Sequence, residues 1–261
     1  MASRPPVAVL HAPGTNRDGE AALALEVAGA DARIVLLVDL ASGRDRLERY
    51  AGVVVPGGFS YGDALGAGTR LALEAGEALR AYADAEDGAR PVLGICNGFQ
   101  ALVRSGLLGA GIGPDAPRRA TLTANAGGRF ECRWVTLEPQ PSCTAAWVGS
   151  IGHLVACPVA HGEGRLAVRG PEVEASLAAE GLVAFRYVDH EGAPAGRAYP
   201  ANPNGSAGDI AGLSNAGGNV VGLMPHPEDH VLEAQDAFRG RRPGRLGRTL
   251  FERFVARARG D

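Results

Sequence analysis

Residues 92–100 read VLGICNGFQ and place a cysteine where a strand gives way to a helix. The apolar run Pro91–Ile95 predicts a buried strand, and Gly98–Val103 predicts the start of a helix. Glycines two residues before and two residues after Cys96 permit the tight turn of a nucleophile elbow. The helix N-terminus that follows stabilises a thiolate, and backbone N–H groups at the turn can receive an oxyanion. The alternative is an ordinary strand-to-helix turn with an incidental cysteine.

The rest of the first hundred residues alternates between strand and helix signals. Short apolar runs predict strands over 7–10, 33–38 and 52–55, and helical periodicity predicts helices over 18–28 and 69–83. Continuous apolar strands separated by helices are typical of a parallel sheet that is covered on both faces. We therefore predict an α/β fold with a doubly wound, mainly parallel sheet, which binds its substrate beyond the carboxyl ends of the strands.

The pattern changes from about Arg129 onward. Strands are predicted over 130–137, 155–160, 182–188 and 220–224, with glycine and proline turns and little helix between them. These segments predict antiparallel strands or hairpins added to the parallel core. A helix is predicted again over 245–257. With no internal repeat and no long linker, residues 1–261 are expected to form a single domain.

Composition excludes several classes of function. The 261-residue chain has 46% hydrophobic residues and a net charge of −3, and all of its 26 basic residues are arginine. A chain without lysine has neither a Walker A phosphate loop nor a Schiff-base lysine for pyridoxal phosphate. Balanced charge argues against nucleic acid as a partner, and no apolar run approaches the length that spans a bilayer. With no signal-peptide core, we expect a cytoplasmic protein.

The cysteines are spaced too widely for a structural metal site. Cys96, Cys132, Cys143 and Cys157 include no CxxC pair, and zinc sites are usually built from closely spaced cysteines and histidines. A disulfide framework is also not expected in a chain of this size without a secretion signal. We predict no metal, and three of the four cysteines are expected to be unreactive thiols.

A base for the cysteine is predicted in MPHPE at 224–228. Prolines on both sides of His226 exclude helical geometry and are expected to hold the segment extended. In an extended chain Glu228 lies on the same side as His226, so its carboxylate can orient the imidazole. The alternative is that His226 is a structural histidine.

A glycine pair follows the third predicted strand, in PGGFSYGD at 56–63. Glycines at the carboxyl end of a strand let backbone N–H groups approach a ligand closely, as an oxyanion hole requires. The alternative is a plain loop.

Together these motifs resemble the class I, or triad, glutamine amidotransferases, and among them the glutaminase subunits of phosphoribosylformylglycinamidine synthase. The motifs are GGFSYGD at 57–63, GICNGFQ at 94–100, HGEG at 161–164, NPNGS at 202–206 and MPHPE at 224–228. The resemblance covers most of the chain and implies a flavodoxin-like sheet. It also implies hydrolysis of L-glutamine to glutamate and ammonia in de novo purine biosynthesis. One departure is Asp229, which stands where the family usually has arginine.

The resemblance assigns the catalytic roles. Cys96 would be the nucleophile, His226 the base and then the acid, and Glu228 the residue that orients the imidazole. The amide N–H groups of Gly58 and Asn97 would form the oxyanion hole.

The resemblance also implies how glutamine and the partner are bound. Gln100 and Gly57 would help to hold glutamine. The chain would need no cofactor of its own, because ATP and Mg²⁺ are expected on a separate, large synthetase subunit that receives the ammonia. A third, small bridging subunit is also expected, although the sequence leaves open whether it is required. For His161 and Glu163 a place in the glutamine pocket and a place at the partner interface both remain open.

Two other functions remain as alternatives. One is a stand-alone cysteine hydrolase on the same sheet, such as a deglycase or a peptidase-like protein, which would not explain Gln100 or the prolines beside His226. The other is a catalytically silent regulatory subunit, which a complete set of Cys, His and Glu argues against.

Overall fold

The computed structural model describes residues 3–85, 90–109, 117–241 and 244–261. Its main feature is a nine-stranded sheet that changes character along its width, from parallel to antiparallel. The parallel strands, in spatial order, are β2 (Asp31–Leu36), β1 (Pro6–His11), β3 (Gly52–Val55), β4 (Val92–Ile95) and β11 (Val220–Leu223). The antiparallel strands that continue from β11 are β10 (Ile210–Ser214), β9 (Val183–Val188), β6 (Glu131–Pro139) and β7 (Val155–His161). A separate pair consists of β5 (Ala120–Thr123) and β8 (Arg165–Val168).

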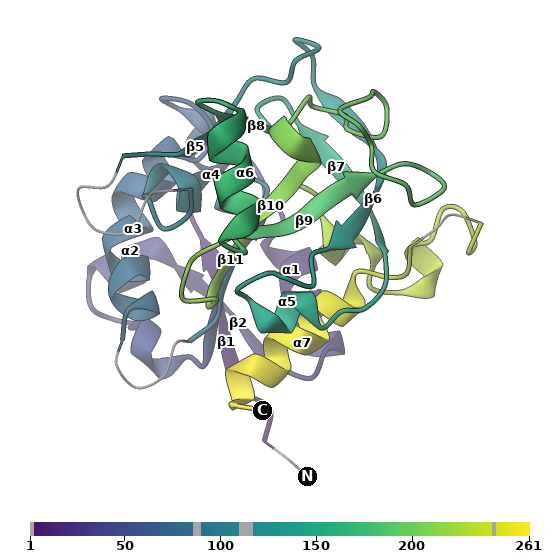
Figure 1. The fold of residues 1–261 in the computed structure, drawn as a ribbon. Coiled ribbons are helices and arrows are strands. Elements are labelled where there is room, and N and C mark those ends of the chain that lie inside the picture. The colour runs from purple at the N-terminus through teal and green to yellow at the C-terminus, as the bar shows by residue number, and fades with distance from the viewer. Residues whose placement is uncertain (1–2, 86–89, 110–116, 242–243) are drawn as a thin grey trace.

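Helices cover both faces of the parallel half (Figure 1). The helices are α1 (Asp18–Val27), α2 (Leu37–Ala41), α3 (Thr69–Ala83), α4 (Asn97–Arg104), α5 (Ala146–Gly149), α6 (Pro171–Ala179) and α7 (Arg248–Arg259). Helices α3 and α4 pack together on one side of the sheet, and α1, α5 and α7 pack on the other. The predicted doubly wound α/β sheet with added antiparallel strands is therefore confirmed.

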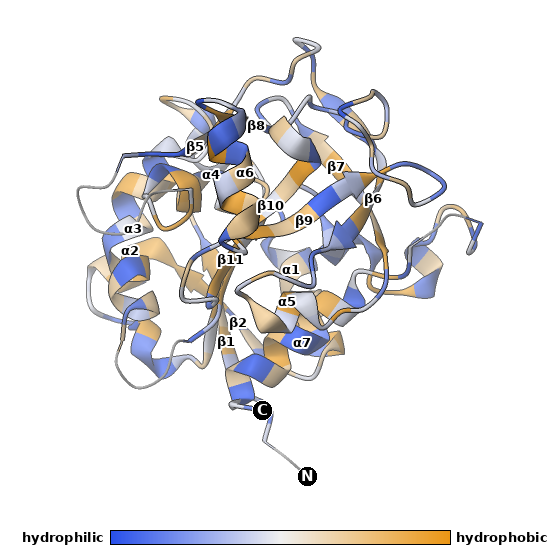
Figure 2. Cartoon of the chain, in the orientation of Figure 1, coloured by the Kyte–Doolittle hydropathy of each residue, from blue (hydrophilic) through white to orange (hydrophobic). Residues whose placement is uncertain are grey.

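The core lies where the helices meet the central strands. All four residues of β3, of β4 and of β11 are buried, as expected for strands covered on both faces. Figure 2 shows these strands as a hydrophobic band through the middle of the molecule, with hydrophilic side chains on the outer surfaces of the helices. A buried central strand gives a rigid support to whatever follows its carboxyl end.

Three of the sequence predictions need correction. Residues 220–224 were expected among the antiparallel additions, but β11 pairs in parallel with β4 and becomes antiparallel only toward β10. The strand predicted over 33–38 ends at Leu36, and Leu37 begins the short helix α2. Val38 in this helix is 60% exposed, so the apolar run does not stay buried as the strand prediction requires. Helix α6 also lies in the region where little helix was expected. The prediction that residues 1–261 form one domain stays a prediction.

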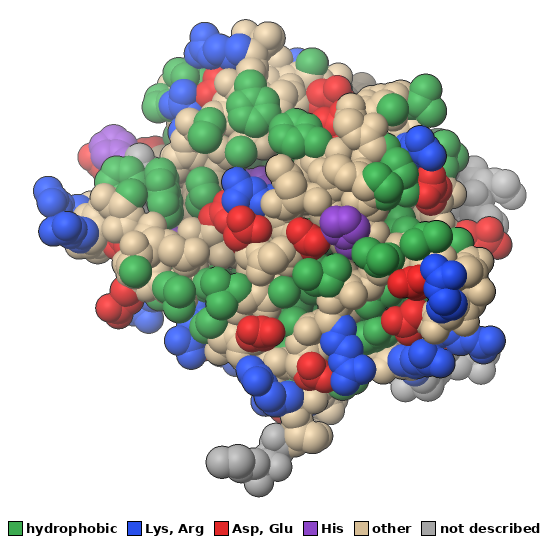
Figure 3. All heavy atoms as spheres, turned by 180° about the vertical axis from the view of Figure 1, so that it is seen from behind, with side chains coloured by type: hydrophobic (Ala, Val, Ile, Leu, Met, Phe, Trp, Pro, Cys, Tyr) green, Lys and Arg blue, Asp and Glu red, His purple; other side chains and the backbone are tan. Residues whose placement is uncertain are grey.

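The surface carries no segregated charge on the face drawn in Figure 3. Acidic and basic side chains of the described residues are interspersed there with small hydrophobic areas. Such a mixture is consistent with the near balance of charge in the sequence. None of the helices in the described part of the chain is long and apolar enough to cross a membrane.

Candidate active site

Cys96 lies at a strained turn between β4 and α4. Its φ of 50° is in the left-handed region, where a residue with a side chain is uncommon. A Cβ on Gly94 would lie 2.9 Å from the carbonyl oxygen of Gly98, and one on Gly98 would collide with the carbonyl oxygen of Val55. Both neighbouring glycines are therefore needed for the turn, which has the geometry of the predicted nucleophile elbow.

His226 lies beside Cys96 because neighbouring strands end at the same edge. The N–H of Cys96 donates to the carbonyl of Leu223 at the end of β11 (2.8 Å), and the N–H of His226 donates to Pro158 of β7 (2.8 Å). The His226 Nδ1 atom lies 2.7 Å from Glu228 Oε1, and both residues are buried. Because a carboxylate accepts, Nδ1 carries the hydrogen, and Nε2 is the atom left for the thiol.

The path of the chain from His226 to Glu228 differs from the sequence prediction. Instead of continuing extended, the chain enters a 3₁₀ helix over Pro227–His230, with proline at its first position. Proline suits this position because it has no N–H to satisfy and its fixed φ fits the helix. Glu228 therefore reaches His226 around a turn, and the predicted contact is made by a different backbone.

Opposing effects act on the charge of His226. Burial disfavours its charged form, but the Glu228 carboxylate and then the Cys96 sulfur outweigh burial and raise the pKa of His226 well above its usual value. The imidazole Nε2 atom has no hydrogen-bond partner among the described residues. A protonated imidazole next to a sulfur is the electrostatic setting in which a cysteine acts as a nucleophile.

The glycine pair of the 56–63 loop faces the same turn. A Cβ on Gly57 would lie 2.7 Å from His226 Cε1 and 3.4 Å from the Cβ of Cys96. Gly58 has a φ of 125°, and a Cβ there would lie 2.7 Å from the backbone nitrogen of Asn16. Only glycine fits at these two positions, so the loop backbone can approach a substrate bound at Cys96.

A turn between β7 and β8 forms the opposite wall. The Gln100 side chain donates to the carbonyl oxygen of Glu163 (2.8 Å) and accepts from Asn97 Nδ2 (3.2 Å). Gln100 therefore links helix α4 to this turn. The Cys96 sulfur lies 3.8 Å from the carbonyl oxygen of Ala160, the residue that precedes His161 in β7.

A buried asparagine supports the wall from behind. Asn125 Nδ2 donates to the carbonyl oxygens of Arg129 and His161, while its Oδ1 accepts from the N–H of Gly164 (3.0 Å). The same oxygen lies 3.2 Å from His161 Nδ1, so His161 carries its hydrogen on Nδ1. Burial, and then repulsion from His226, lower the pKa of His161 to about 4, so this imidazole is neutral.

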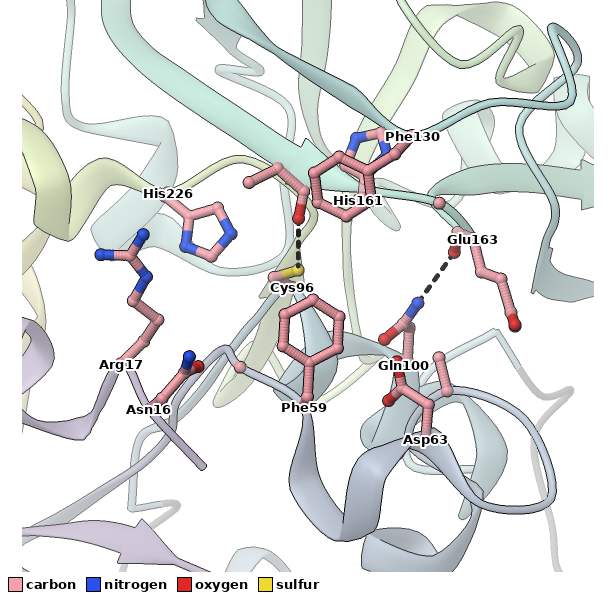
Figure 4. A pocket seen from close by; sticks show the side chains of 14 residues that line it. Asn16, Arg17, Phe59, Asp63, Cys96, Gln100, Phe130, His161, Glu163 and His226 are labelled. Carbon is pink, nitrogen blue, oxygen red and sulfur yellow. Dashed lines mark hydrogen bonds between the residues drawn. The ribbon is translucent and has the colours of Figure 1, made fainter. Parts of the chain in front are cut away.

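These elements enclose a cavity of about 290 Å³ (Figure 4). It contains the predicted residues Cys96, His226, Gly58 and Gln100. The other polar and aromatic side chains of the cavity are Asn16, Arg17, Phe59, Asp63, Phe130, His161 and Glu163. For His161 and Glu163 the sequence left the glutamine pocket and the partner interface open, and both residues line the cavity. Phe59 and Asp63 were within a quoted motif but had no assigned role, whereas Asn16, Arg17 and Phe130 come from segments without a motif.

The departure at Asp229 has a structural counterpart in Arg17. Arg17 Nη1 lies 3.5 Å from Asp229 Oδ1 and 3.0 Å from Glu20 Oε1. The position after Glu228 therefore holds a carboxylate that contacts an arginine from the loop that precedes α1. Ligand atoms of His226, Glu228 and Asp229 lie within 4.8 Å of one another. Because Arg17 already neutralises Asp229 and His226 Nδ1 already contacts Glu228, we assign no metal to them.

The other cysteines differ from Cys96 in their surroundings. Cys143 and Cys157 are buried, and burial raises the pKa of Cys143 and raises that of Cys157 well above its usual value. Cys132 is exposed on β6. Of the four cysteines, Cys96 is the one that lines the cavity.

Known proteins are similar to this chain over most of its length. Residues 4–254 match the CobB/CobQ-like glutamine amidotransferase domain. Phosphoribosylformylglycinamidine synthase subunit PurQ of Treponema denticola is 44% identical over 243 residues, which cover 88% of this chain and 89% of the relative. Human phosphoribosylformylglycinamidine synthase is 38% identical over 251 residues, 90% of this chain but 18% of that protein. A solved structure described as PurLQS from Thermotoga maritima has a TM-score of 0.73 and 32% identity, with 97% of this chain and 99% of that one covered.

Proposed function

The chain belongs to the CobB/CobQ-like glutamine amidotransferase family, and we propose that Cys96, His226 and Glu228 form its catalytic triad. The observation that supports this assignment most directly is the pair of His226 and Glu228, 2.7 Å apart, whose free imidazole nitrogen is next to the one cysteine in the cavity. The chain acts as the glutaminase subunit of phosphoribosylformylglycinamidine synthase, in de novo purine biosynthesis.

The first half of the reaction releases ammonia. The Cys96 sulfur attacks the carboxamide carbon of glutamine, and the carbonyl oxygen takes up negative charge. Backbone N–H groups of Gly58 and Asn97 stabilise that oxygen. The Asn97 N–H, at the first position of α4, belongs to the amides that have no acceptor within the helix. His226 then gives its Nε2 proton to the departing nitrogen, and a γ-glutamyl thioester and ammonia are formed.

The second half restores the enzyme. Water attacks the thioester carbon while His226 Nε2 accepts the proton from the water. The carbon–sulfur bond then breaks to give glutamate and the Cys96 thiolate, which restores the thiolate and protonated imidazole with which the reaction began. Glu228 stabilises the imidazolium in both halves and holds the ring in one tautomer. Gln100 and Gly57 shape the glutamine site, Gln100 by fixing the 161–164 turn and Gly57 by leaving room for the His226 ring.

The ammonia is passed to a partner chain. In our proposal, a large synthetase subunit binds ATP and Mg²⁺ and converts formylglycinamide ribonucleotide to the amidine, and a small bridging subunit completes the assembly. Two observations support a division between chains. The sequence has no lysine for a phosphate loop. The chain also spans only 18% of the human relative, whereas it spans 89% of the bacterial one. A cytoplasmic location, as the sequence predicts, suits such an assembly.

A test compares Cys96→Ser with Cys132→Ser, a change at an exposed cysteine outside the cavity. We expect glutamate formation from glutamine to be lost in Cys96→Ser and retained in Cys132→Ser. A diazoketone analogue of glutamine should label the wild type at Cys96 and leave Cys143 and Cys157 unmodified. Hydrolysis that survives in Cys96→Ser, or equal labelling of all four cysteines, would overturn the assignment.

A further inference from the structure

One side of the cavity is acidic. In Figure 4, Asp63, Gln100 and Glu163 lie on one side of Cys96, while Arg17 and His226 lie on the other. Asp63 comes from the 3₁₀ helix Ser60–Asp63 at the end of the glycine loop, and Glu163 comes from the turn between β7 and β8. The carboxylates of Asp63 and Glu163 therefore lie together on one side of the nucleophile. The cations on the other side already have carboxylate partners, Arg17 in Glu20 and Asp229 and His226 in Glu228.

Neutral groups hold the two acidic residues in position. Asp63 Oδ1 accepts a hydrogen bond from Asn97 Nδ2 (3.0 Å). Glu163 is positioned through its main chain, since its carbonyl oxygen accepts from Gln100 and the next residue, Gly164, donates to Asn125. Both carboxylates therefore lie in the cavity wall, and the hydrogen bonds that hold these residues leave carboxylate oxygens able to accept further hydrogen bonds.

Among the described residues, no cation lies close enough to neutralise the carboxylates of this side. Arg104 Nη2 lies 3.9 Å from Glu163 Oε2, which is beyond hydrogen-bond distance. Burial and then repulsion from Glu163 raise the pKa of Asp63, and no arginine among the described residues opposes that rise. A positive group placed between the two carboxylates would relieve this repulsion.

We propose that Asp63 and Glu163 bind the α-ammonium group of glutamine, an assignment that rests on the glutaminase function proposed above. With the carboxamide at Cys96, two methylene groups separate the reacting carbon from the α-carbon, so the amino acid end points along the cavity and away from the sulfur. An ammonium has three N–H donors, which two carboxylates can accept. It is attracted to the acidic side, where the two carboxylates have no close cation among the described residues.

The pair therefore selects an α-amino acid amide over a simple amide. An amide without the α-amino group would leave two partly buried carboxylates facing each other with no counter-charge. Asp63 is expected to contribute more to ammonium binding than Glu163. The Glu163 side chain is 40% exposed, so solvent weakens its attraction for the ammonium.

The test measures ammonia release by the full chain from two amides. They are L-glutamine and 4-carbamoylbutanoate, which is glutamine without its α-amino group. Asp63→Asn and Glu163→Gln should lower kcat/KM for glutamine by about tenfold to a hundredfold, mainly through KM, because a charge-assisted hydrogen bond is lost. For 4-carbamoylbutanoate each variant should stay within about twofold of the wild type. The matched control is Glu191→Gln, which changes an exposed carboxylate outside the cavity. It should leave the rates with both amides unchanged.

Two results would count against the inference in different ways. If both variants lose the same factor with both amides, Asp63 and Glu163 only support the loop and the wall, and the ammonium assignment is wrong. If the wild type releases ammonia from neither amide, the glutaminase function itself fails. Should Asp63→Asn not fold, Glu163→Gln still decides, because its main-chain contacts do not involve the side chain.

Discussion

Two buried histidines, His226 and His161, stand on the two walls of the cavity and differ in charge. Each is about 3% exposed or less, and each has its Nδ1 hydrogen directed to an oxygen of a neighbouring side chain. The oxygen is a carboxylate of Glu228 for His226 and an amide oxygen of Asn125 for His161. The pKa of His226 is raised well above its usual value, whereas that of His161 is lowered to about 4.

The difference shows that burial alone does not decide whether a histidine is charged. Both rings lose the same kind of contact with water, which favours the neutral form. At His226 the full negative charge of Glu228, together with the Cys96 sulfur, reverses that preference. The segment with the carboxylate is thus equipped for proton transfer, and the segment with the amide provides a fixed, uncharged wall.

Removing the negative charge of Glu228, which distinguishes the surroundings of the two histidines, should cause the largest loss of activity. Glu228→Gln keeps the shape but no longer stabilises the imidazolium, so we expect kcat for glutamine hydrolysis to fall by about 10³–10⁴. The measurement is steady-state glutamate formation, with Glu233→Gln, a nearby residue outside the cavity, as the control. A loss of less than tenfold would show that Glu228 does not orient the base.

The two histidines should also make stability depend on pH in opposite directions. The folded-state pKa of His161, about 4, is below its unfolded value of about 6.5, so the unfolded chain takes up a proton first as the pH falls. His161 should therefore lower the free energy of unfolding between pH 6.5 and 4 by up to about 3 kcal/mol. His226, whose folded-state pKa is raised, contributes stability below pH 6.5 that is lost as the pH rises through its folded value.

Urea unfolding at pH 7 and at pH 4.5 measures this contrast in the wild type and in His161→Gln. The fall in stability between the two pH values should be smaller in the variant. His190→Gln, at a side chain 83% exposed, should keep the fall of the wild type. An unchanged fall in His161→Gln would mean that His161 is charged in the folded protein.

Each ring also packs against a glycine, which allows the two walls to be disturbed separately. Gly57→Ala would place a methyl group 2.7 Å from His226 Cε1 and displace the base. We expect kcat to fall by about 10², as is typical when a catalytic group is misplaced by about 1 Å. The control is Gly19→Ala in helix α1, where a Cβ meets nothing within 4 Å. A normal kcat in Gly57→Ala would show that the ring can move without loss.

Gly164→Ala should have the smallest effect on catalysis. Its methyl group would lie 2.5 Å from His161 Cε1, so the turn or the ring must shift, at a cost of about 1–3 kcal/mol in stability. Thermal unfolding should report that cost, and kcat should change less than in Gly57→Ala because His161 transfers no proton. A larger loss of kcat than in Gly57→Ala would give His161 a catalytic role.

Local patterns in the sequence were sufficient for much of the parallel half. The helix predicted over 69–83 is found at Thr69–Ala83, with Leu71, Ala75 and Leu79 buried as the periodicity requires. The predicted strand at Gly52–Val55 is also found. Strands such as β10 were missed because Ile210–Ser214 is short and contains Gly212, and its place is set by pairing with distant strands.

For the site, the sequence predicted contacts between residues that are close along the chain but not between distant ones. The contact between His226 and Glu228 could be predicted because the two residues are two positions apart, although the 3₁₀ turn between them was not. The acidic side of the cavity could not be predicted. Asp63 and Glu163 are a hundred residues apart in the sequence, and only the fold brings them to one cavity. The loop that supplies Arg17 has no motif to mark it.

The position of β11 has a consequence for how the protein is made. This strand is inserted between β4 and β10, and the N–H of Cys96 bonds to its last residue, Leu223. Until β11 is synthesised, β4 has an unpaired edge on the side away from β3, and the turn at Cys96 lacks both its contact with Leu223 and the neighbouring His226. At about 5–20 residues per second, the ribosome needs on the order of ten seconds to travel from Cys96 to His226. Translation therefore keeps the proposed nucleophile apart from its proposed base until the segment that contains His226 has been made.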